Sequence, residues 1–157
     1  MIQKTIKKLI QTYQTRDPFQ LVLACNIKLL YADLGHVGGF YQYYKRSKLI
    51  TINQNLNEQQ QREVCAHELG HALLHPKQNK FFLHQNTYQN SNKLEREANL
   101  FAACLLIDEN DTREFLQQGA TIDYISSVTG VTPPLVEERI RMFLKENAKN
   151  ELQTECR

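Results

Sequence analysis

The sequence contains no apolar run that approaches the roughly 18 residues of a membrane-spanning helix. It also contains no internal repeat and no low-complexity segment. Its first residues, MIQKTIKKLIQTYQ, interleave lysines with apolar residues, which is typical of an amphipathic helix and unlike the unbroken apolar stretch of an export signal. These absences argue against a membrane protein, a repeat protein and an exported protein.

Paired cysteines and an excess of charge of one sign are also missing. The four cysteines, at positions 25, 65, 104 and 156, are widely scattered and form no C-x-x-C motif, which excludes a zinc ribbon and a disulfide scaffold. The net charge of +2 is too small for a strongly basic nucleic-acid-binding protein. The glycines fit neither GxGxxG nor a P-loop, so phosphate cradling by them is not expected. We therefore expect a reduced, cytoplasmic protein.

The remaining composition is that of an ordinary globular protein, and its periodicities predict a mainly helical α+β fold. A length of 157 residues suits one domain with a real hydrophobic core. Helices are predicted at residues 2–14, from 17 onwards, at 57–76, 92–107, 111–118, 121–129 and 133–147. A short strand is predicted at 29–33, followed by a β-hairpin with strands at 40–44 and 49–53.

One short string in the third of these helices carries chemistry. Residues 67–71 read HELGH and fit the H-E-x-x-H pattern of zinc peptidases. On a helix, His67 and His71 lie one turn apart on the same face, so both imidazoles can reach one metal ion. Glu68 lies beside them, where a carboxylate can accept a proton from water activated by the metal. The string predicts half of a zinc site together with its catalytic base.

A third zinc ligand has to come from elsewhere, since zinc in hydrolases usually takes three protein ligands and leaves one position for water. The extended pattern H-E-x-x-H-x-x-G-x-x-H does not apply, because Leu74 and Lys77 occupy its glycine and histidine positions. The other common solution is a carboxylate from a second helix. The string EREAN offers Glu95, with Asn99 one turn later on the same face to support a histidine ring. We predict that this glutamate completes the site.

Alternatives remain open for this carboxylate. Glu95 stands three residues after Asn92 and could instead be the glutamate of a helix capping box. Glu97 is the reserve ligand, although it points to a different side of the helix from Asn99. The sequence alone does not decide between them.

The other histidines and the tyrosines are weaker candidates. His75 continues the histidine stripe but lies one turn too far along to reach the same ion, so we interpret it as a supporting or helix C-terminal residue. His84 and Tyr88 on the polar stretch 77–91, or His36 in the glycine-rich segment, could stabilise an oxyanion. An edge strand of the hairpin could bind substrate as an added strand, and its tyrosines 41, 43 and 44 either supply pockets or pack.

With these pieces in order, the chain resembles the ImmA/IrrE family of metallopeptidases over about residues 20–145. The matching features are GFYQYY and LITIN, then REVCAHELGHALLH, then EREANLFAACLL, and finally the tail TIDYISSVTGVTPPLVEERIRMF. Their order and spacing are far more specific than HELGH alone. Family members often carry a proline soon after the LL pair, where this chain has Ile107-Asp108, so the end of that helix is left open.

The resemblance implies a gluzincin-type peptidase in which His67, His71 and Glu95 bind zinc and Glu68 is the catalytic glutamate. It further implies cleavage of a helix-turn-helix repressor, as phage and mobile-element members of the family perform, or of a stress-response regulator. No membrane partner is expected.

The predicted architecture is one zincin-like metallopeptidase domain over residues 1–157. Its catalytic core is expected at 1–110, with a small antiparallel sheet or β-hairpin before the HELGH helix. A helical C-terminal subregion is expected at 111–147. The oligomeric state is left open.

Two other functions compete with the peptidase. Residues 121–144 contain two short helices around Gly130 that could form a DNA-reading helix-turn-helix. The second of these helices mixes Arg139 and Arg141 with glutamates, which suits a packed or partner-docking helix better than a groove reader. The third possibility is a zinc-containing module that binds a repressor without cutting it.

Overall fold

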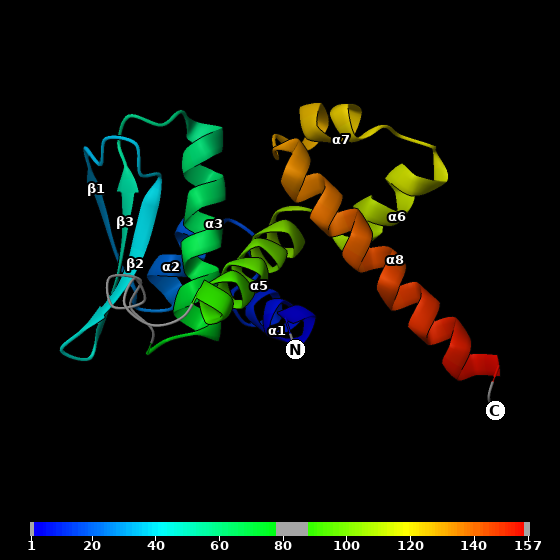
Figure 1. Cartoon of the computed structure of the whole chain (residues 1–157), viewed down its shortest axis with the longest axis horizontal. Helices are drawn as coiled ribbons and strands as arrows, with labels where there is room; N and C mark the ends of the chain where they lie inside the picture. Colours follow the sequence, from blue (N-terminus) through cyan, green and yellow to red (C-terminus); the bar gives the residue numbers. More distant parts are fainter. Residues whose placement is uncertain (1, 78–87, 156–157) are drawn as a thin grey trace.

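The computed structural model describes the backbone of residues 2–77 and 88–155, and the side chains of 2–77 and 93–148. Its helices are α1 (Ile2–Tyr13), α2 (Pro18–Ala24), α3 (Glu58–Leu74), α5 (Tyr88–Leu106), α6 (Glu109–Gln117), α7 (Ile122–Thr129) and α8 (Pro133–Glu155). Its strands are β1 (Lys28–Ala32), β2 (Gly39–Tyr44) and β3 (Ser47–Asn53). The predicted mainly helical α+β class is confirmed, and Figure 1 shows the sheet on one side of α3 and helices α5 to α8 on the other.

The three strands form one mixed sheet in the order β1-β3-β2. The predicted hairpin is present, with β2 and β3 antiparallel and Tyr41 opposite Ile50. The first strand extends the hairpin in a way that the sequence pattern did not show, because β1 runs parallel to β3, with Leu29 opposite Ile50. This pairing arises because the chain leaves β1, forms β2 at the far edge, and then turns back to place β3 between the two strands.

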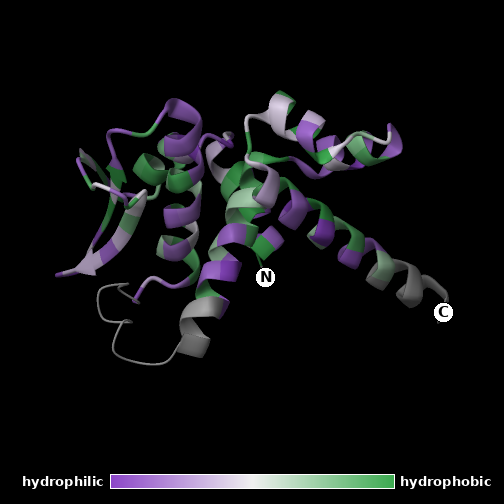
Figure 2. Cartoon of the chain, turned by 45° about the horizontal axis from the view of Figure 1, so that its top comes forward, coloured by the Kyte–Doolittle hydropathy of each residue, from purple (hydrophilic) through white to green (hydrophobic). Residues whose placement is uncertain are grey.

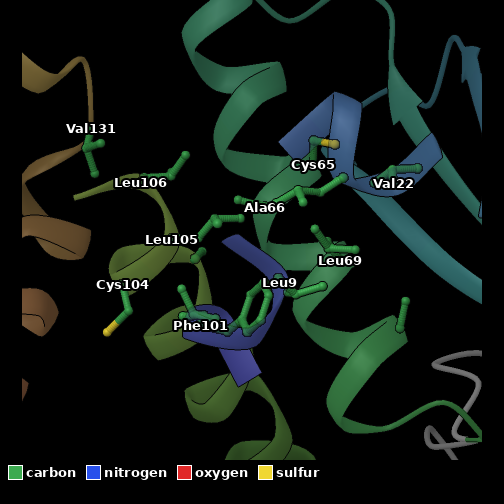
Figure 3. Close-up of a cluster of buried hydrophobic side chains, with 14 of the residues drawn as sticks. Leu9, Val22, Cys65, Ala66, Leu69, Phe101, Cys104, Leu105, Leu106 and Val131 are labelled. Carbon is green, nitrogen blue, oxygen red and sulfur yellow. The ribbon is translucent and has the colours of Figure 1, made fainter. Parts of the chain in front are cut away.

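The sheet and α5 meet on α3, which is the central helix of the molecule. Helix α3 has Asn57 as its N-cap. The Asn57 side chain accepts from the Gln60 backbone amide, and the Gln60 side chain accepts from the Asn57 backbone amide, so the two residues form a capping box. Figure 3 shows Ala66 and Leu69 of α3 with Phe101 and Leu105 of α5 in the hydrophobic core, while Cys65 lies on the side of α3 that faces Val22 of α2. Burial on this scale dominates folding free energy and fixes α3 relative to α5.

The two helices that carry the sequence motifs approach closely at one glycine. A Cβ placed on Gly70 would lie 3.1 Å from Phe101 Cδ1 and 3.2 Å from Ala98 Cα. These contacts leave almost no room for a side chain, since protein interiors are close-packed. The two helices therefore approach each other closely at Gly70 and Ala98.

Two helix boundaries differ from the sequence prediction. Helix α5 begins at Tyr88, four residues before Asn92, so Asn92 lies inside the helix and does not cap it. Helix α8 continues to Glu155, beyond the expected end at 147. The segment that follows Asn147 contains no glycine or proline, so nothing in the chain stops the helix there. At its other end α5 stops at Leu106, and the Asp108 side chain caps α6 through the Asn110 amide.

Helix α8 packs against α5, and α6 and α7 in turn pack against α8. Arg139 on α8 is only 2% exposed and donates from Nε to the Ile107 carbonyl oxygen at 3.0 Å. Figure 2 shows hydrophobic and hydrophilic residues alternating along α8, which leads away from the body of the molecule. Among the described helices, none combines the length and the apolar character needed to cross a membrane.

Candidate metal centre

Two helices bring the motif residues together. His67 and His71 project from one face of α3, and Glu95 projects from α5 across the close contact at Gly70. The His67 and His71 side chains are 18% and 7% exposed. Among the described residues, these three are the His, Cys, Asp or Glu side chains whose ligand atoms converge closely enough to hold one metal ion.

The spacing of the three ligand atoms fits a tetrahedral ion. The two Nε2 atoms of His67 and His71 lie 3.1 Å apart. One carboxylate oxygen of Glu95 lies 3.3 Å from the first nitrogen, and the other lies 3.4 Å from the second. Ligand atoms bound at zinc distances around one tetrahedral ion would stand about 3.3 Å apart. The site is therefore already arranged for a metal.

Asn99 fixes the orientation and tautomer of one histidine ring. Its Oδ1 lies 2.8 Å from Nδ1 of His67. An amide oxygen can only accept a hydrogen bond, so Nδ1 of His67 is the donor and the lone pair is left on Nε2. That nitrogen faces Glu95 and His71. The arrangement is the support that metal-binding histidines generally receive from a neighbouring polar group.

Glu97, the reserve ligand, lies apart from this group. Its Oε2 is 3.1 Å from Nε2 of His75, and His75 is the C-cap residue of α3. Burial lowers the pKa of His75, and the nearby Glu97 carboxylate partly offsets this by raising it. The structure thus places Glu95 with His67 and His71, and it pairs Glu97 with His75.

A pocket of about 260 Å³ opens beside the convergent group. Glu68 lines this pocket together with His67 and Asn99, and its side chain is buried, with the residue only 3% exposed. The carboxylate therefore borders a space that a small part of a substrate can enter. Such a largely buried acid next to a metal-binding group is well placed to exchange protons with water.

The pocket has one wall from the sheet. Gly38 and Gly39, where β2 begins, lie against Val64 of α3. A Cβ on Gly39 would come within 2.5 Å of Val64 Cγ1 and 2.8 Å of the Thr51 carbonyl oxygen, so no larger residue fits without displacement. The Asn53 side chain holds the preceding loop by donating to the carbonyl oxygens of Gly35 and Val37. This wall is rigid and places backbone next to Glu68.

The opposite wall comes from the C-terminal helices. Leu135, near the start of α8, lines the pocket. Glu63 of α3 holds the start of α8 in place, because its carboxylate accepts from the Thr132 backbone amide and, at 2.9 Å, from the Thr132 hydroxyl. Arg62 adds a longer bond of 3.4 Å to the Thr129 carbonyl oxygen. The contacts of the α7–α8 turn with α3 therefore position the helix that carries Leu135.

Several residues suggested by the sequence are not in this group. His36 is exposed and does not line the pocket. His84 lies outside the described residues, and Tyr88 begins α5 but its side chain is not described. Of the hairpin tyrosines, Tyr41 is buried and donates its hydroxyl to the Pro76 carbonyl oxygen at 2.8 Å, while Tyr44 is exposed. Tyr41 is thus a packing residue that secures the end of α3.

Sequence reasoning missed Glu63, Leu135 and the glycine pair at positions 38 and 39. The pair was visible as a break before a strand, but its role depends on Val64, which follows 25 residues after Gly39. Leu135 and Glu63 come from segments far apart in the chain, and no local periodicity connects them. The described cysteines 25, 65 and 104 are free, as their scatter predicted.

The possible helix-turn-helix has its two helices on either side of Gly130, but Arg139 and Arg141 are engaged within the protein. Gly130 ends α7 in the left-handed conformation with φ of 67°. Arg139 is buried against α5, and Arg141 pairs with Glu138 at 2.8 Å. The start of α8, which would enter a groove, instead lies against α3.

Known proteins share both the sequence and the fold. The family model Peptidase_M78, described as the IrrE N-terminal-like domain, matches residues 24–141. A protein of Bacillus phage phi105 called "Uncharacterized immunity region protein 2" is 39% identical over 136 residues, which cover 86% of each chain. Metallopeptidase ImmA of Bacillus subtilis (strain 168) is 32% identical over 132 residues, which cover 83% of this chain and 78% of that protein.

A solved structure supports the fold alone. A Mycobacterium tuberculosis transcriptional regulator matches 88% of this chain with a TM-score of 0.62 and 17% identity, and the match spans 45% of that longer chain. The family match covers most of the sequence and includes both motif helices. The chain therefore belongs to the IrrE N-terminal-like family, the ImmA/IrrE type of metallopeptidase.

Proposed function

We propose that the chain is a zinc-dependent endopeptidase in which His67, His71 and Glu95 hold the ion and Glu68 is the general base. The observation that carries this proposal is the convergence of two imidazole nitrogens and a carboxylate at 3.1–3.4 Å beside a pocket lined by Glu68. Two histidines and one glutamate are a standard donor set for catalytic zinc, which makes water more acidic and polarises a carbonyl.

The side chains of this chain would then divide the proton transfers. Glu68 accepts the proton of the attacking water and later delivers it to the leaving amine, so that a poor leaving group departs as a neutral amine. Asn99 keeps the His67 ring in the tautomer that leaves Nε2 unprotonated. The rigid packing at Gly70 keeps Glu95 within reach of both histidines, so little reorganisation is needed during the reaction.

The substrate is proposed to lie along β2. In the described sheet β2 pairs with β3 on one side, which leaves its other edge able to pair with an extended peptide. The start of this strand lines the pocket that contains Glu68, so a peptide on the edge would bring a scissile bond to the base. Val64 and Leu135 supply apolar walls for one of its side chains.

We further propose that the natural substrate is a helix-turn-helix repressor, and that residues 1–110 and 111–147 act as one domain. The support for the substrate is the relation to a phage immunity region protein and to metallopeptidase ImmA. The support for one domain is the packing of α8 on α5 and the contribution of Leu135 to the pocket. DNA binding is not favoured, because Arg139 is buried.

The decisive experiment compares the chain with its Glu68→Gln variant. Each is loaded with zinc and incubated with a helix-turn-helix repressor encoded beside it in its genome, and intact masses are measured. We expect the unaltered chain to give two fragments whose masses sum to that of the repressor plus one water. The variant should retain stoichiometric zinc and lose at least about a thousandfold in rate, as expected when general-base catalysis is removed.

Elemental analysis of both proteins is the control for metal content. Equal cleavage by Glu68→Gln would contradict the role assigned to Glu68. Tight repressor binding without fragments would favour the alternative of a non-cleaving module that sequesters its partner. Cleavage that survives exhaustive chelation would contradict the assignment of the metal.

A further inference from the structure

A second, separate pocket lies where the α2–β1 connection meets the tip of the β2–β3 hairpin. Its volume is about 350 Å³, which is within the range of small-molecule sites. The lining includes Asn26, Lys28, Tyr43, Arg46, Ser47 and Lys48. None of these residues lines the pocket beside Glu68, and among them only Tyr43 belongs to the strand along which the substrate is proposed to lie.

The lining is strongly basic. Lys28, Arg46 and Lys48 all border the pocket, and no carboxylate is among its described lining residues. None of the three forms an ion pair with a described acidic side chain. A concave surface that collects positive charge without a counterion attracts and concentrates anions.

The backbone of the hairpin tip adds a second observation. Lys45 and Arg46 form the two-residue turn between β2 and β3, and both have positive φ, 47° and 64°. Turns of this kind favour Asn-Gly because other residues are strained there. The chain thus keeps two long cationic residues at positions where smaller ones would fold more easily, and Arg46 is the one that borders the pocket.

Lys48, which borders the pocket, also contacts helix α3. Its Nζ donates to the Ala72 carbonyl oxygen at 2.8 Å, in the last turn of α3 and one residue after His71. A ligand that attracts this ammonium group competes with the end of α3 for it.

We propose that this pocket binds the phosphate group of a small molecule. A phosphate monoester carries nearly two negative charges and three acceptor oxygens, which matches three cationic side chains better than a single carboxylate does. Arginine and lysine are the residues that usually provide such recognition. The proposal is independent of the peptidase assignment, because the two sites share no residue.

The test is a titration of the ¹⁵N-labelled full chain with inorganic phosphate at constant ionic strength, followed by amide NMR. We expect saturable shifts that centre on residues 26–28 and 46–48. Succinate, a dicarboxylate of similar charge, should bind at least about fivefold more weakly, because it lacks the phosphoryl oxygens that these side chains contact. A linear response without saturation, or equal affinity for succinate, would overturn the proposal.

Arg46→Gln and Lys45→Gln form a matched pair of variants for this test. Both remove one positive charge from the same turn at a similar φ, but only Arg46 borders the pocket. We expect Arg46→Gln to weaken phosphate binding about fivefold or more, since a charge-assisted hydrogen bond is lost, and Lys45→Gln to change it less than about twofold. Lys28→Gln, which lies outside the turn, should reproduce the loss. Equal effects of all three substitutions would contradict a defined site.

Discussion

Helix α3 has two packing interfaces of opposite character. We call the interface with α5 the apolar joint and the interface with the start of α8 the polar joint. The joint with α5 is apolar and buried, and at Gly70 it has no space for a side chain. The joint with α8 is polar and partly exposed, and it depends on hydrogen bonds from Thr132 to Glu63. The first joint sets the distance between Glu95 and the two histidines of HELGH, whereas the second sets one wall of the pocket. Rigid packing is thus used where geometry must be exact to a few tenths of an ångström, and adjustable polar contacts where substrates must fit.

The largest effect should come from breaking the apolar joint. Gly70→Leu inserts a side chain against Phe101 and Ala98, whose atoms already lie at 3.1–3.2 Å from a Cβ. We expect a loss of about 3 kcal/mol in the free energy of unfolding, the upper range for an overpacked core. Urea unfolding followed by circular dichroism, with and without zinc, measures it.

Gly70→Ala provides a graded comparison for the same joint. It adds one methyl group at the same contacts and gains helix propensity, so its loss should be clearly smaller than that of the leucine variant. Adding zinc should raise the free energy of unfolding less for Gly70→Leu than for the unaltered chain, because the helices of the variant no longer bring Glu95 to His71. Equal free energies of unfolding for the two variants would show that the packing around Gly70 can rearrange to accommodate a larger side chain.

An intermediate effect is expected at the metal support on the same joint. Asn99→Ala removes the acceptor for Nδ1 of His67, and loss of such a partner typically lowers metal affinity by about 10- to 100-fold. Competition with a chromogenic chelator measures the affinity. Arg96→Ala, an exposed position on the same helix, is the control and should leave it unchanged. An unaltered affinity in Asn99→Ala would remove Asn99 from the site.

The smallest effect should come from the polar joint. Glu63→Gln weakens both bonds to Thr132 and should cost about 1 kcal/mol, the usual net value of a hydrogen bond. Zinc affinity should stay unchanged while kcat/KM for a cleaved peptide falls, since only the Leu135 wall moves. Glu58→Gln, at the exposed start of α3, is the matched control. A loss of metal binding in Glu63→Gln would mean that the two joints are not separable.

These differences also explain what the sequence could and could not predict. The spacing of His67 and His71 is a property of one helix, so a local pattern reveals it. Glu95 could be proposed as a ligand because the sequence predicts a second helix with a polar face. Glu95 and Glu97 are two residues apart, so a helix turns their side chains to different sides, and they contact different histidines. The parallel pairing of β1 with β3 and the wall formed by Leu135 depend on how distant segments cross. No periodicity within either segment carries that information.

The position of Leu135 has a consequence for how such chains diverge. The pocket wall that it forms belongs to α8, about 40 residues after the glutamate of the second motif, and it is held by contacts that tolerate change. Substitutions in the α7–α8 turn can therefore alter which partner is accepted while HELGH and EREAN stay constant. The proposed chemistry can in this way stay constant while the proposed substrate changes.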